Sequence, residues 1–522
     1  MSSTTAALNP PLRAGRREWI GLAVIALPCL LYSMDLTVLN LAVPALAREL
    51  QPTPSQLLWI IDIYGFMVAG MLVTMGTLGD RIGRRRLLLI GAAAFGVASV
   101  LAAASNSAGM LIATRALLGV AGATLAPSTL SLIRSMFHDP RQRTTAIGIW
   151  ISSFSLGAAI GPVVGGALIE FFSWRAAFLI NVPVMLLLLA LGPSLLPEFR
   201  DPQARRIDLP SAAMSIAAVL PTIYGLKRLA EQGFVLDSPA ALLPWAAMLA
   251  GLAVGVAFVH RQRRLAEPLI DLGLFRAHGF TPALVIYMTG GLVMFGVFVF
   301  IAQYLQLVLG LNALQAGWWM VPSALGFVVG STVTPRLVGR VSVRVLIVGG
   351  LAISAVSLLV LAAAGPASGP ALVVGGLLLQ AIGMAPVFTL ATELIVGSVE
   401  PERAGAASAM SETCAEFGGA LGIAIFGSLG TAIYRVAMAD ADAGAVPAGA
   451  ALDAARATLA GAASLAQQPG GSALLGAAHD AFVQGQRVTL WIGATLLAAT
   501  AVMAKLTLRS GTSAPHGSEA GA

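Results

Sequence analysis

Apolar residues gather in long runs along the chain, and short polar segments separate one run from the next. Fourteen runs reach the roughly 20 residues that a helix needs to cross a bilayer; they centre near residues 30, 67, 95, 122, 157, 185, 216, 250, 295, 326, 352, 384, 418 and 497. Lipid offers no partner to open backbone groups, and these runs do not alternate as barrel strands would, so each is predicted to be helical. The pattern predicts an all-α polytopic membrane protein with 14 transmembrane helices.

Composition narrows the class of protein further. Hydrophobic residues make up 57% of the 522 positions and charged residues only 11%, with a mean hydropathy of +0.85, whereas soluble domains carry about 25% charged residues. This excludes a cytosolic enzyme, a nucleic-acid binder and a secreted domain. Cys29 and Cys414 both lie inside apolar runs, so neither a disulfide framework nor a metal cluster is expected. No phosphate-binding Gly-x-x-x-x-Gly-Lys-Ser/Thr loop is present, which argues against ATP drive, and no cofactor is expected.

The positions of Lys and Arg predict the orientation in the membrane. With an even number of spans, 23 of the 31 basic residues fall on the side that holds both termini, seven fall on the other side, and Arg115 lies within a span. Basic residues are in excess on the cytoplasmic side, so both termini are predicted to be cytoplasmic, in the cell (inner or cytoplasmic) membrane. The first apolar run is too long for a signal peptide and carries Asp35, so it is predicted to be a retained helix.

The second half of the sequence repeats features of the first. The loop 79–84 resembles 335–340, Ala-Pro occurs at 126–127 and at 385–386, and the glycine-rich stretch 157–161 resembles 418–422, with offsets of 256 to 261 residues. This predicts two pseudo-symmetric six-helix halves with a transport site between them near the membrane midplane. The predicted boundaries are a cytoplasmic tail 1–17, a first half 18–197, a linker with two helices 198–278, a second half 279–509 with a partly helical external loop 437–484, and a tail 510–522.

Several motifs now resemble a known family. The stretch 76–86 resembles the loop signature of the major facilitator superfamily, and its residues are Gly76, Gly79, Asp80, Arg81, Gly83, Arg84 and Arg85. The fifth helix resembles the superfamily's antiporter motif in Gly157, Gly161, Pro162, Gly165 and Gly166. The stretch 34–40 resembles the first helix of the fourteen-helix drug:proton antiporters, and 59–64 resembles the quaternary-ammonium and methyl viologen efflux pumps among them. The resemblance implies the major facilitator fold, arranged as 6+2+6 helices.

Each motif has a physical reading of its own. Asp80 can pair with Arg81, Arg84 or nearby helix ends, and such pairs can latch the outward-facing state; the alternative is simple anchoring of the loop by positive charge. The glycine ladder Gly157, Gly161 and Gly165 permits close helix contact, and Pro162 adds a kink. Tight packing and a specific role in antiport both remain open for this ladder.

Ionisable residues inside spans are costly and therefore point to function. At about 1.5 Å per residue, Asp35 lies roughly 24 Å along a core of about 30 Å, while Asp62 and Arg115 each lie about 8 Å below the outer edge. The three are therefore close in depth and predicted to serve proton or substrate coupling. Each residue also has a purely structural explanation. Asp35 can be a polar residue held against the backbone near the outer interface, and Asp62 can be an acid at that interface. Arg115 can be the partner in a structural ion pair. The resemblance links Arg115 to proton transfer.

Glu412 and Glu416 are the strongest pair of candidates. They lie about 12 and 18 Å into their helix, on either side of the midplane, and share one face. Two ionised carboxylates there would repel each other in poorly solvating surroundings, so one of them is expected to hold a proton until a cation arrives. The alternative is that Glu412 and Glu416 line a water-filled vestibule and take no part in proton exchange. Glu393 and Glu170 are predicted to be interfacial. Aromatic residues that can offer cation–π contacts to a substrate are Tyr32, Trp150, Phe154, Tyr304 and Trp318.

These features predict a proton-coupled multidrug efflux antiporter that exports lipophilic, cationic compounds such as quaternary ammonium biocides, dyes and antibiotics. The expected partners are small-molecule substrates, protons and the lipid bilayer, with no nucleic acid, and the chain is expected to act as a monomer. A dedicated exporter of a self-made antibiotic, amino acid or siderophore is an alternative. A non-transporting receptor or enzyme is less favoured, because the short loops supply no soluble sensory or catalytic domain and the five scattered histidines supply no metal site.

Overall fold

Polar residues at the edges of the apolar runs start the helices of the computed structural model. The Ser107 hydroxyl accepts the backbone N–H of Met110 at 3.2 Å, and Asp139 accepts that of Gln142 at 3.0 Å, which satisfies otherwise open donors at two helix beginnings. The structure describes residues 13–52, 54–200, 208–232, 239–265, 268, 272–277, 279–311, 313–338, 340–365, 368–400, 404–439, 441, 449–466 and 471–508. Some side chains within these ranges, including those of Asp62, Pro162 and Glu170, lie outside what is described, as do most of both predicted tails.

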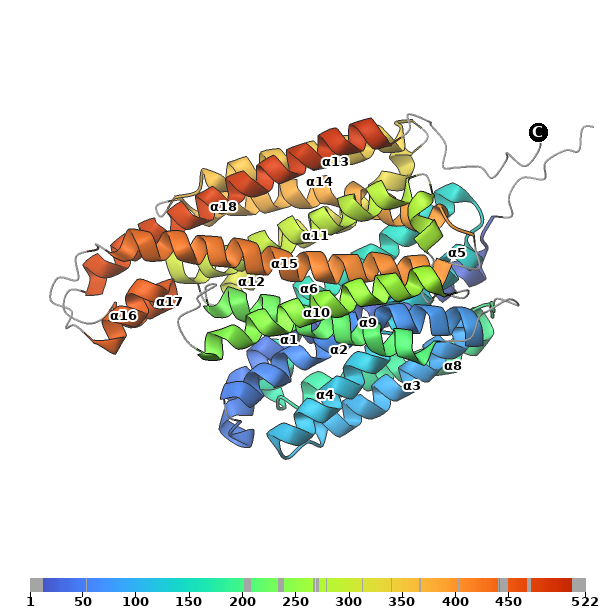
Figure 1. Cartoon of the computed structure of the whole chain (residues 1–522), viewed down its shortest axis with the longest axis horizontal. Coiled ribbons are helices and arrows are strands. Elements are labelled where there is room, and N and C mark those ends of the chain that lie inside the picture. Colours follow the sequence, from blue (N-terminus) through green and yellow to red (C-terminus); the bar gives the residue numbers. More distant parts are fainter. Residues whose placement is uncertain are drawn as a thin grey trace, which may run out of the picture.

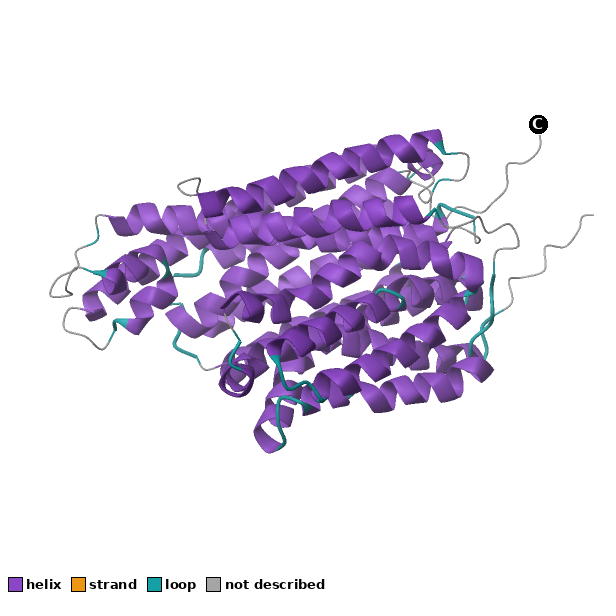
Figure 2. Ribbon diagram, turned by 60° about the horizontal axis from the view of Figure 1, so that its bottom comes forward, coloured by secondary structure: helices purple, strands orange, loops and turns teal. Residues whose placement is uncertain are grey.

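The described helices of the first half and the linker belong to a structure that is almost entirely helical (Figure 2). They are α1 (Arg16–Leu50), α2 (Pro54–Ile82), α3 (Arg84–Ala103), α4 (Ala108–Gly122), α5 (Leu125–Met136), α6 (Pro140–Phe171), α7 (Ala176–Leu179), α8 (Asn181–Leu195), α9 (Leu209–Gln232) and α10 (Pro239–Arg264).

The second half begins after a short 3-10 helix, η1 (Leu272–Arg276). It comprises α11 (Phe280–Gln303), the π-helical turn η2 (Tyr304–Val308), α12 (Ala313–Leu337), α13 (Val343–Ala362), α14 (Pro370–Gly397), α15 (Ala404–Ala439), α16 (Ala450–Ala457), α17 (Leu459–Ser464) and α18 (Gly471–Thr507). The described residues contain no β-strand. The predicted external loop 437–484 is largely helical in its described part, because α15 continues into it and α18 begins within it.

The fourth predicted span is broken near its middle into two helices. The run centred near residue 122 forms α4 and α5, with turns at Ala123 and Thr124 between them. Pro127 explains the break, because proline lacks the N–H that would bond to the carbonyl of Ala123 and its ring crowds that carbonyl. The two pieces together still form one candidate span of 29 residues, Ala108–Met136.

Among the described residues, twelve helices are long and apolar enough to cross a membrane. Each of the fourteen predicted centres lies in a helix, but α6 and α9 are not among the twelve, and α9 is represented only by a shorter apolar stretch, Pro210–Leu226. The all-helical membrane fold is therefore confirmed, whereas the number fourteen stays a prediction.

The chain enters α1 and leaves α18 at the same end of the bundle, which we call the terminal end. The N–H of Ala14 donates to Gln142 at the start of α6 at 2.8 Å. Helix α18 runs antiparallel to α13, where Arg487 donates to the carbonyl of Ala362 at 3.1 Å, so α18 ends beside the start of α13. Helices α16 and α17 lie at the opposite end, on the left of Figure 1, which we call the distal end.

The two halves lie side by side, with α9 and α10 packed over one seam between them (Figure 1). Helix α9 contacts both α2 of the first half and α15 of the second, and α10 packs on α9. A small apolar cluster of Phe66, Ala69, Ile223 and Ala420 fills this junction. On the other side of the bundle, α6 packs directly against α12. The pair α9–α10 therefore bridges the halves rather than extending either one.

Close glycine contacts recur at matching places in the two halves. A Cβ on Gly157 of α6 would stand 2.1 Å from the carbonyl oxygen of Leu30 in α1. A Cβ on Gly418 of α15, the counterpart of Gly157 in the repeat, would stand 2.5 Å from the carbonyl oxygen of Met288 in α11. Real Cβ atoms do not approach backbone so closely, so only glycine permits these two helix pairs to pack as they do. The internal repeat seen in the sequence thus corresponds to the same packing arrangement in each half.

Candidate functional site

Asp35 and Arg115 form a buried ion pair between α1 and α4. The Arg115 Nη1 and Asp35 Oδ2 atoms are 3.1 Å apart, and the two side chains are 1% and 5% exposed. Arg115 also donates through Nε to the carbonyl of Ile60 at 2.6 Å and through Nη2 to that of Ile61 at 3.4 Å. The sequence depths placed these two residues at one level, and the fold brings them together. Arg115 is held from three sides, so its guanidinium has a fixed position.

Tyr64 lies beneath the guanidinium and connects the ion pair to the centre of the bundle. The Tyr64 ring centroid is 5.2 Å from the Arg115 guanidinium carbon, a cation–π distance. The ring of Tyr64 also lies 5.8 Å from that of Tyr32. Neither tyrosine is exposed beyond 9%. The third predicted member of this group, Asp62, has a side chain outside the described residues.

Glu412 and Glu416 each meet a tyrosine hydroxyl. Tyr32 of α1 donates to Glu416 Oε1 at 3.4 Å, and Tyr287 of α11 donates to Glu412 Oε1 at 3.5 Å. Both carboxyl groups are half-buried on α15. Because α1 belongs to the first half and α15 to the second, the Tyr32–Glu416 bond crosses between halves. Sequence reasoning did not single out Tyr287 or Tyr64 as site residues, although tyrosine inside an apolar run is a usable signal in a chain with only six tyrosines.

Aromatic rings extend this site along the first half. Phe154 lies 5.8 Å from Tyr32 and 4.9 Å from Trp150, each in an edge-on arrangement. The Trp150 indole N–H donates to the Thr129 hydroxyl at 2.9 Å, so that ring is fixed. Three of the five predicted aromatic candidates, Tyr32, Trp150 and Phe154, therefore form one connected group.

The other two aromatic candidates lie elsewhere. Tyr304 is fully buried in the π-helical turn η2, where its hydroxyl donates to the carbonyl of Gly365 at 2.7 Å. Trp318 is 58% exposed on α12 and makes no ring contact with another described residue. Tyr304 thus holds the segment that follows α13 through its hydrogen bond to Gly365. The structure does not place Trp318 beside Glu412 or Glu416.

The loop signature is organised around Asp80 and Arg84. Arg84 is 1% exposed, donates through Nε to Asp80 Oδ1 at 3.0 Å and lies 4.9 Å from the Phe199 ring. Arg85 pairs with Glu198 at 3.4 Å. Arg84 is therefore one of the partners predicted for Asp80 that the structure shows in contact with it.

The glycines of this signature permit the close approaches. Gly83 has a φ of +107° and lies so near Glu198 that a Cβ would stand 2.4 Å from its Oε1 atom. Gly79 and Gly76 are buried within α2, and Arg81 is half-buried. These contacts join α2, α3 and the end of α8 within the first half.

The glycine ladder of α6 packs on α1 at two levels. Gly157 meets the backbone of Leu30, and a Cβ on Gly165 would stand 2.6 Å from Val38. Gly161 is buried, whereas Gly166 has open space beside it. Tight packing is thus accounted for at Gly157 and Gly165. It positions α1, the helix that carries both Tyr32 and Asp35.

Polar contacts between the halves gather at the terminal end. Arg134 of α5 donates to the carbonyl of Val396 in the last turn of α14 and to that of Val399 just beyond it. Thr144 of α6 donates to Glu393 of α14. Arg143 adds an ion pair to Glu393 at 3.6 Å. Nearby, the hydroxyls of Ser152 and Ser331 are in contact. Glu393 therefore joins the halves, a role that its place near a helix end did not reveal, and this end of the seam is closed.

Metal binding has no support among the described residues, which contain no group of three His, Cys, Asp or Glu that could hold an ion. The basic and acidic groups of the site instead form ion pairs and hydrogen bonds with each other. The half-buried carboxyl groups of Glu412 and Glu416 next to tyrosine hydroxyls, with a fixed guanidinium nearby, can take up and release protons or bind a cation.

Comparisons with known proteins agree with this architecture. The sequence model of the Major Facilitator Superfamily matches residues 25–423. The multidrug efflux pump LfrA of Mycolicibacterium smegmatis is 42% identical over 502 residues, which cover 95% of this chain and 97% of that protein. The methyl viologen resistance protein SmvA of Salmonella typhimurium is 36% identical over 413 residues, or 79% and 82% of the two chains.

Among solved structures, the fold is similar to two transporters. A bacterial homologue of the human lysosomal transporter Spinster, in an inward-facing and unoccupied conformation, matches with a TM-score of 0.57 and 17% identity, covering 95% of this chain and 98% of that one. The human organic anion transporter MFSD10 matches with a TM-score of 0.55 and 16% identity, covering 92% and 99%. These two likenesses concern the fold alone. With the family match over most of its length and relatives above 30% identity, the chain belongs to the major facilitator superfamily and is a membrane transporter.

Proposed function

We propose that this transporter is a proton-coupled antiporter that exports lipophilic, mainly cationic compounds. The observation that carries the proposal is the bond between Tyr32 and Glu416, which places an ionisable group of one half against the other half, with Glu412 one turn away. A carboxyl group at such a junction can couple its own protonation to the relative position of the halves.

Coupling follows from competition between a proton and a cation for Glu412 and Glu416. Two ionised carboxylates on one helix face repel each other, so the empty site retains a proton. A lipophilic cation binds the carboxylate and the rings of Tyr32 and Phe154, and expels that proton. Asp35 and Arg115 provide a second protonation point. A proton on Asp35 would weaken its bond to Arg115 and loosen α1 from α4. Asp62, nearer the outer edge, is expected to matter for some cargoes more than others.

The names of related proteins support the cationic cargo. LfrA is named a multidrug efflux pump, and SmvA is named for resistance to methyl viologen, an organic dication. A dedicated exporter of a self-made metabolite is the second candidate. It is favoured by the tetracenomycin C resistance and export protein of Streptomyces glaucescens, which is 30% identical over 414 residues. LfrA is more similar in sequence and is matched over more of its length, which favours multidrug export over export of a single metabolite.

The remaining expectations on placement are part of the same proposal. The terminal end faces the cytoplasm of the cell membrane, given the excess of basic residues there, and the closed contacts at Glu393 then represent an outward-facing or occluded state. The halves 18–197 and 279–509 rock about the site, with the linker 198–278 covering one seam and 437–484 on the outside. The chain acts as a monomer, since each half supplies its own members of the site.

Efflux from cells and proton release from purified protein test this proposal together. Cells that lack other pumps and express the chain should extrude ethidium after energising and tolerate quaternary ammonium biocides. A protonophore should abolish this extrusion. Purified protein should release protons when a substrate is added. The double variant Glu412→Gln with Glu416→Gln should lose release and uphill transport while keeping its membrane level. Glu412→Gln alone should be milder, because the two acids titrate as one unit.

Two outcomes would contradict the proposal. Undiminished proton release from a variant that lacks Asp35, Glu412 and Glu416 together would show that protons travel elsewhere. Unchanged accumulation of every lipophilic cation, with membrane expression confirmed, would remove the cationic cargo and favour the dedicated exporter. Arg263→Gln on α10 serves as the matched control, because it removes an exposed charge remote from the site.

A further inference from the structure

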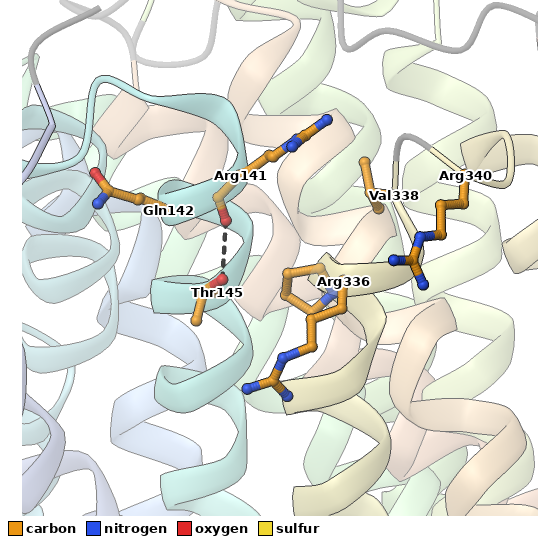
Figure 3. Close-up of a pocket in the computed structure, with 7 residues that line it drawn as sticks. Arg141, Gln142, Thr145, Arg336, Val338 and Arg340 are labelled. Atoms are coloured by element: carbon orange, nitrogen blue, oxygen red, sulfur yellow. Dashed lines mark hydrogen bonds between the residues drawn. The ribbon is translucent and has the colours of Figure 1, made fainter.

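A basic pocket opens at the terminal end of the bundle, between the start of α6 and the end of α12. It has a volume of about 440 Å³. The residues that line it include Arg141, Gln142, Thr145, Arg336, Val338 and Arg340. In Figure 3, Arg141 extends from α6 toward the side of Val338 and Arg340, whereas Gln142 points the other way. The Thr145 hydroxyl donates to the Arg141 carbonyl at 2.9 Å, so hydrogen-bond donors facing the pocket come mainly from the arginines.

The three arginines that line the pocket have no acidic partner among the described residues. Within the described part of the chain, the guanidinium groups of Arg141, Arg336 and Arg340 make no hydrogen bond or ion pair. Other arginines near this end are paired: Arg84 with Asp80, and Arg143 with Glu393. Three like charges around one pocket repel each other. The pocket therefore carries three positive charges that no acidic side chain among the described residues pairs with.

We propose that this pocket binds the phosphate group of an anionic phospholipid. Guanidinium groups hold phosphate oxygens through paired N–H donors. The face of α12 beside the pocket is suited to the attached acyl chains, because it exposes apolar side chains at every fourth position toward Arg336: Leu325, Val329, Val333 and Leu337, which are 52%, 57%, 36% and 36% exposed. Basic clusters at the cytoplasmic surface attract anionic lipids, and the terminal end is the proposed cytoplasmic end.

The pocket also straddles the two halves. Arg141 belongs to α6 of the first half, whereas Arg336 lies in the last turn of α12 in the second half and Arg340 follows the end of that helix. The same helices meet close by, where a Cβ on Gly148 would stand 2.5 Å from the carbonyl oxygen of Ser331. A lipid phosphate bound to arginines of both halves removes their repulsion and holds the terminal end closed. This consequence rests on the proposed alternating access, whereas the binding site itself does not.

Lipid binding to the purified, full-length protein tests the site directly. Native mass spectrometry with added phosphatidylglycerol should show a retained adduct, and phosphatidylcholine should give none. The triple variant Arg141→Gln, Arg336→Gln, Arg340→Gln should bind phosphatidylglycerol about a hundredfold more weakly, since each basic side chain near a membrane surface contributes about fivefold. All three arginines are exposed, so these changes should not disturb folding.

A matched control separates the pocket from general surface charge. The variant Arg263→Gln, Arg264→Gln, Arg276→Gln removes the same charge from exposed residues of α10 and the following turn, and should bind as the unaltered protein does. Equal weakening in both triple variants, or no weakening in the pocket variant, would overturn the site. Inorganic phosphate at 10 mM should leave phosphatidylglycerol bound; this concentration would occupy a site that binds soluble phosphate with a Kd on the order of 1 mM. Displacement of the lipid by phosphate would identify a site for soluble phosphate and overturn the lipid assignment.

Disulfide cross-linking tests whether the bound lipid holds the terminal end closed, and it does not depend on transport. Ser152→Cys with Ser331→Cys, in a background without Cys29 and Cys414, should form a disulfide when the terminal end is closed, because these side chains are in contact. Cross-linking should be more complete in nanodiscs that contain phosphatidylglycerol than in phosphatidylcholine alone, and the pocket variant should lose this difference. A difference that persists in the pocket variant would refute the closing role. Failure of the proposed efflux function would leave the adduct measurement unaffected.

Discussion

Replacing Asp35 with asparagine keeps the size of the side chain but removes the charge that faces Arg115 at 3.1 Å. Removing one partner of a buried ion pair costs about 3–5 kcal/mol, because the other charge is left without compensation. Arg115 keeps its bonds to Ile60 and Ile61 and its contact with the Tyr64 ring, so we expect a cost near the lower limit, about 3 kcal/mol. With an unfolding entropy of about 2 cal/mol/K per residue, this lowers Tm by about 3 °C.

In a Cys414→Ala background, a thiol-reactive dye measures this change, because Cys29 is fully buried and reacts only when the helices separate, whereas Cys414 is half-buried. The variant Arg115→Gln removes the other member of the ion pair, and its loss of stability can be compared with that of Asp35→Asn. It should cost less than Asp35→Asn, since a lone carboxyl can take up a proton whereas a guanidinium cannot lose one. The double variant should be more stable than the sum of the single losses predicts. An Asp35→Asn protein as stable as the unaltered one, or strictly additive losses, would refute the reasoning.

The remaining predictions concern packing, pH and topology. Gly157→Ala should lower both stability and transport, because its Cβ would meet the Leu30 carbonyl, while Gly166→Ala, with open space beside it, should be neutral in the same thermal and efflux assays. The Ser211 hydroxyl and the Arg261 guanidinium hold the pKa of Asp208 below its usual value. The stability that Asp208 adds is therefore present above the ordinary carboxyl pKa of about 4 and is lost as pH falls through the lowered value, so the Tm difference between the protein and Asp208→Asn should shrink in acid. A reporter fused within 449–466 should be labelled from outside the cell; labelling from inside only would refute the topology.

The sequence alone determined the membrane class, the positions of the helices and the depth of the charged groups. These follow from one constraint: lipid leaves a spanning backbone only the helix, and a helix rises by a fixed 1.5 Å per residue. Depth arithmetic therefore placed Asp35 and Arg115 at one level before their contact was known. The family, too, was readable from local motifs such as 76–86, because those residues act within a few turns of one another.

Tertiary structure decided which way each helix faces and which helices meet. Rotation about a helix axis is set by packing against neighbours, so only the fold directs Tyr32 to Glu416 and buries Tyr304 against Gly365. Contacts between distant segments were equally hidden: Arg143 and Glu393 meet across 250 positions of sequence separation, and Arg141 and Arg336 line one pocket from two different halves. Apolar patterning indicates how far into the membrane a residue lies, because every spanning helix crosses the same hydrocarbon core. Its partners depend on the shapes of the other helices, which no single segment encodes.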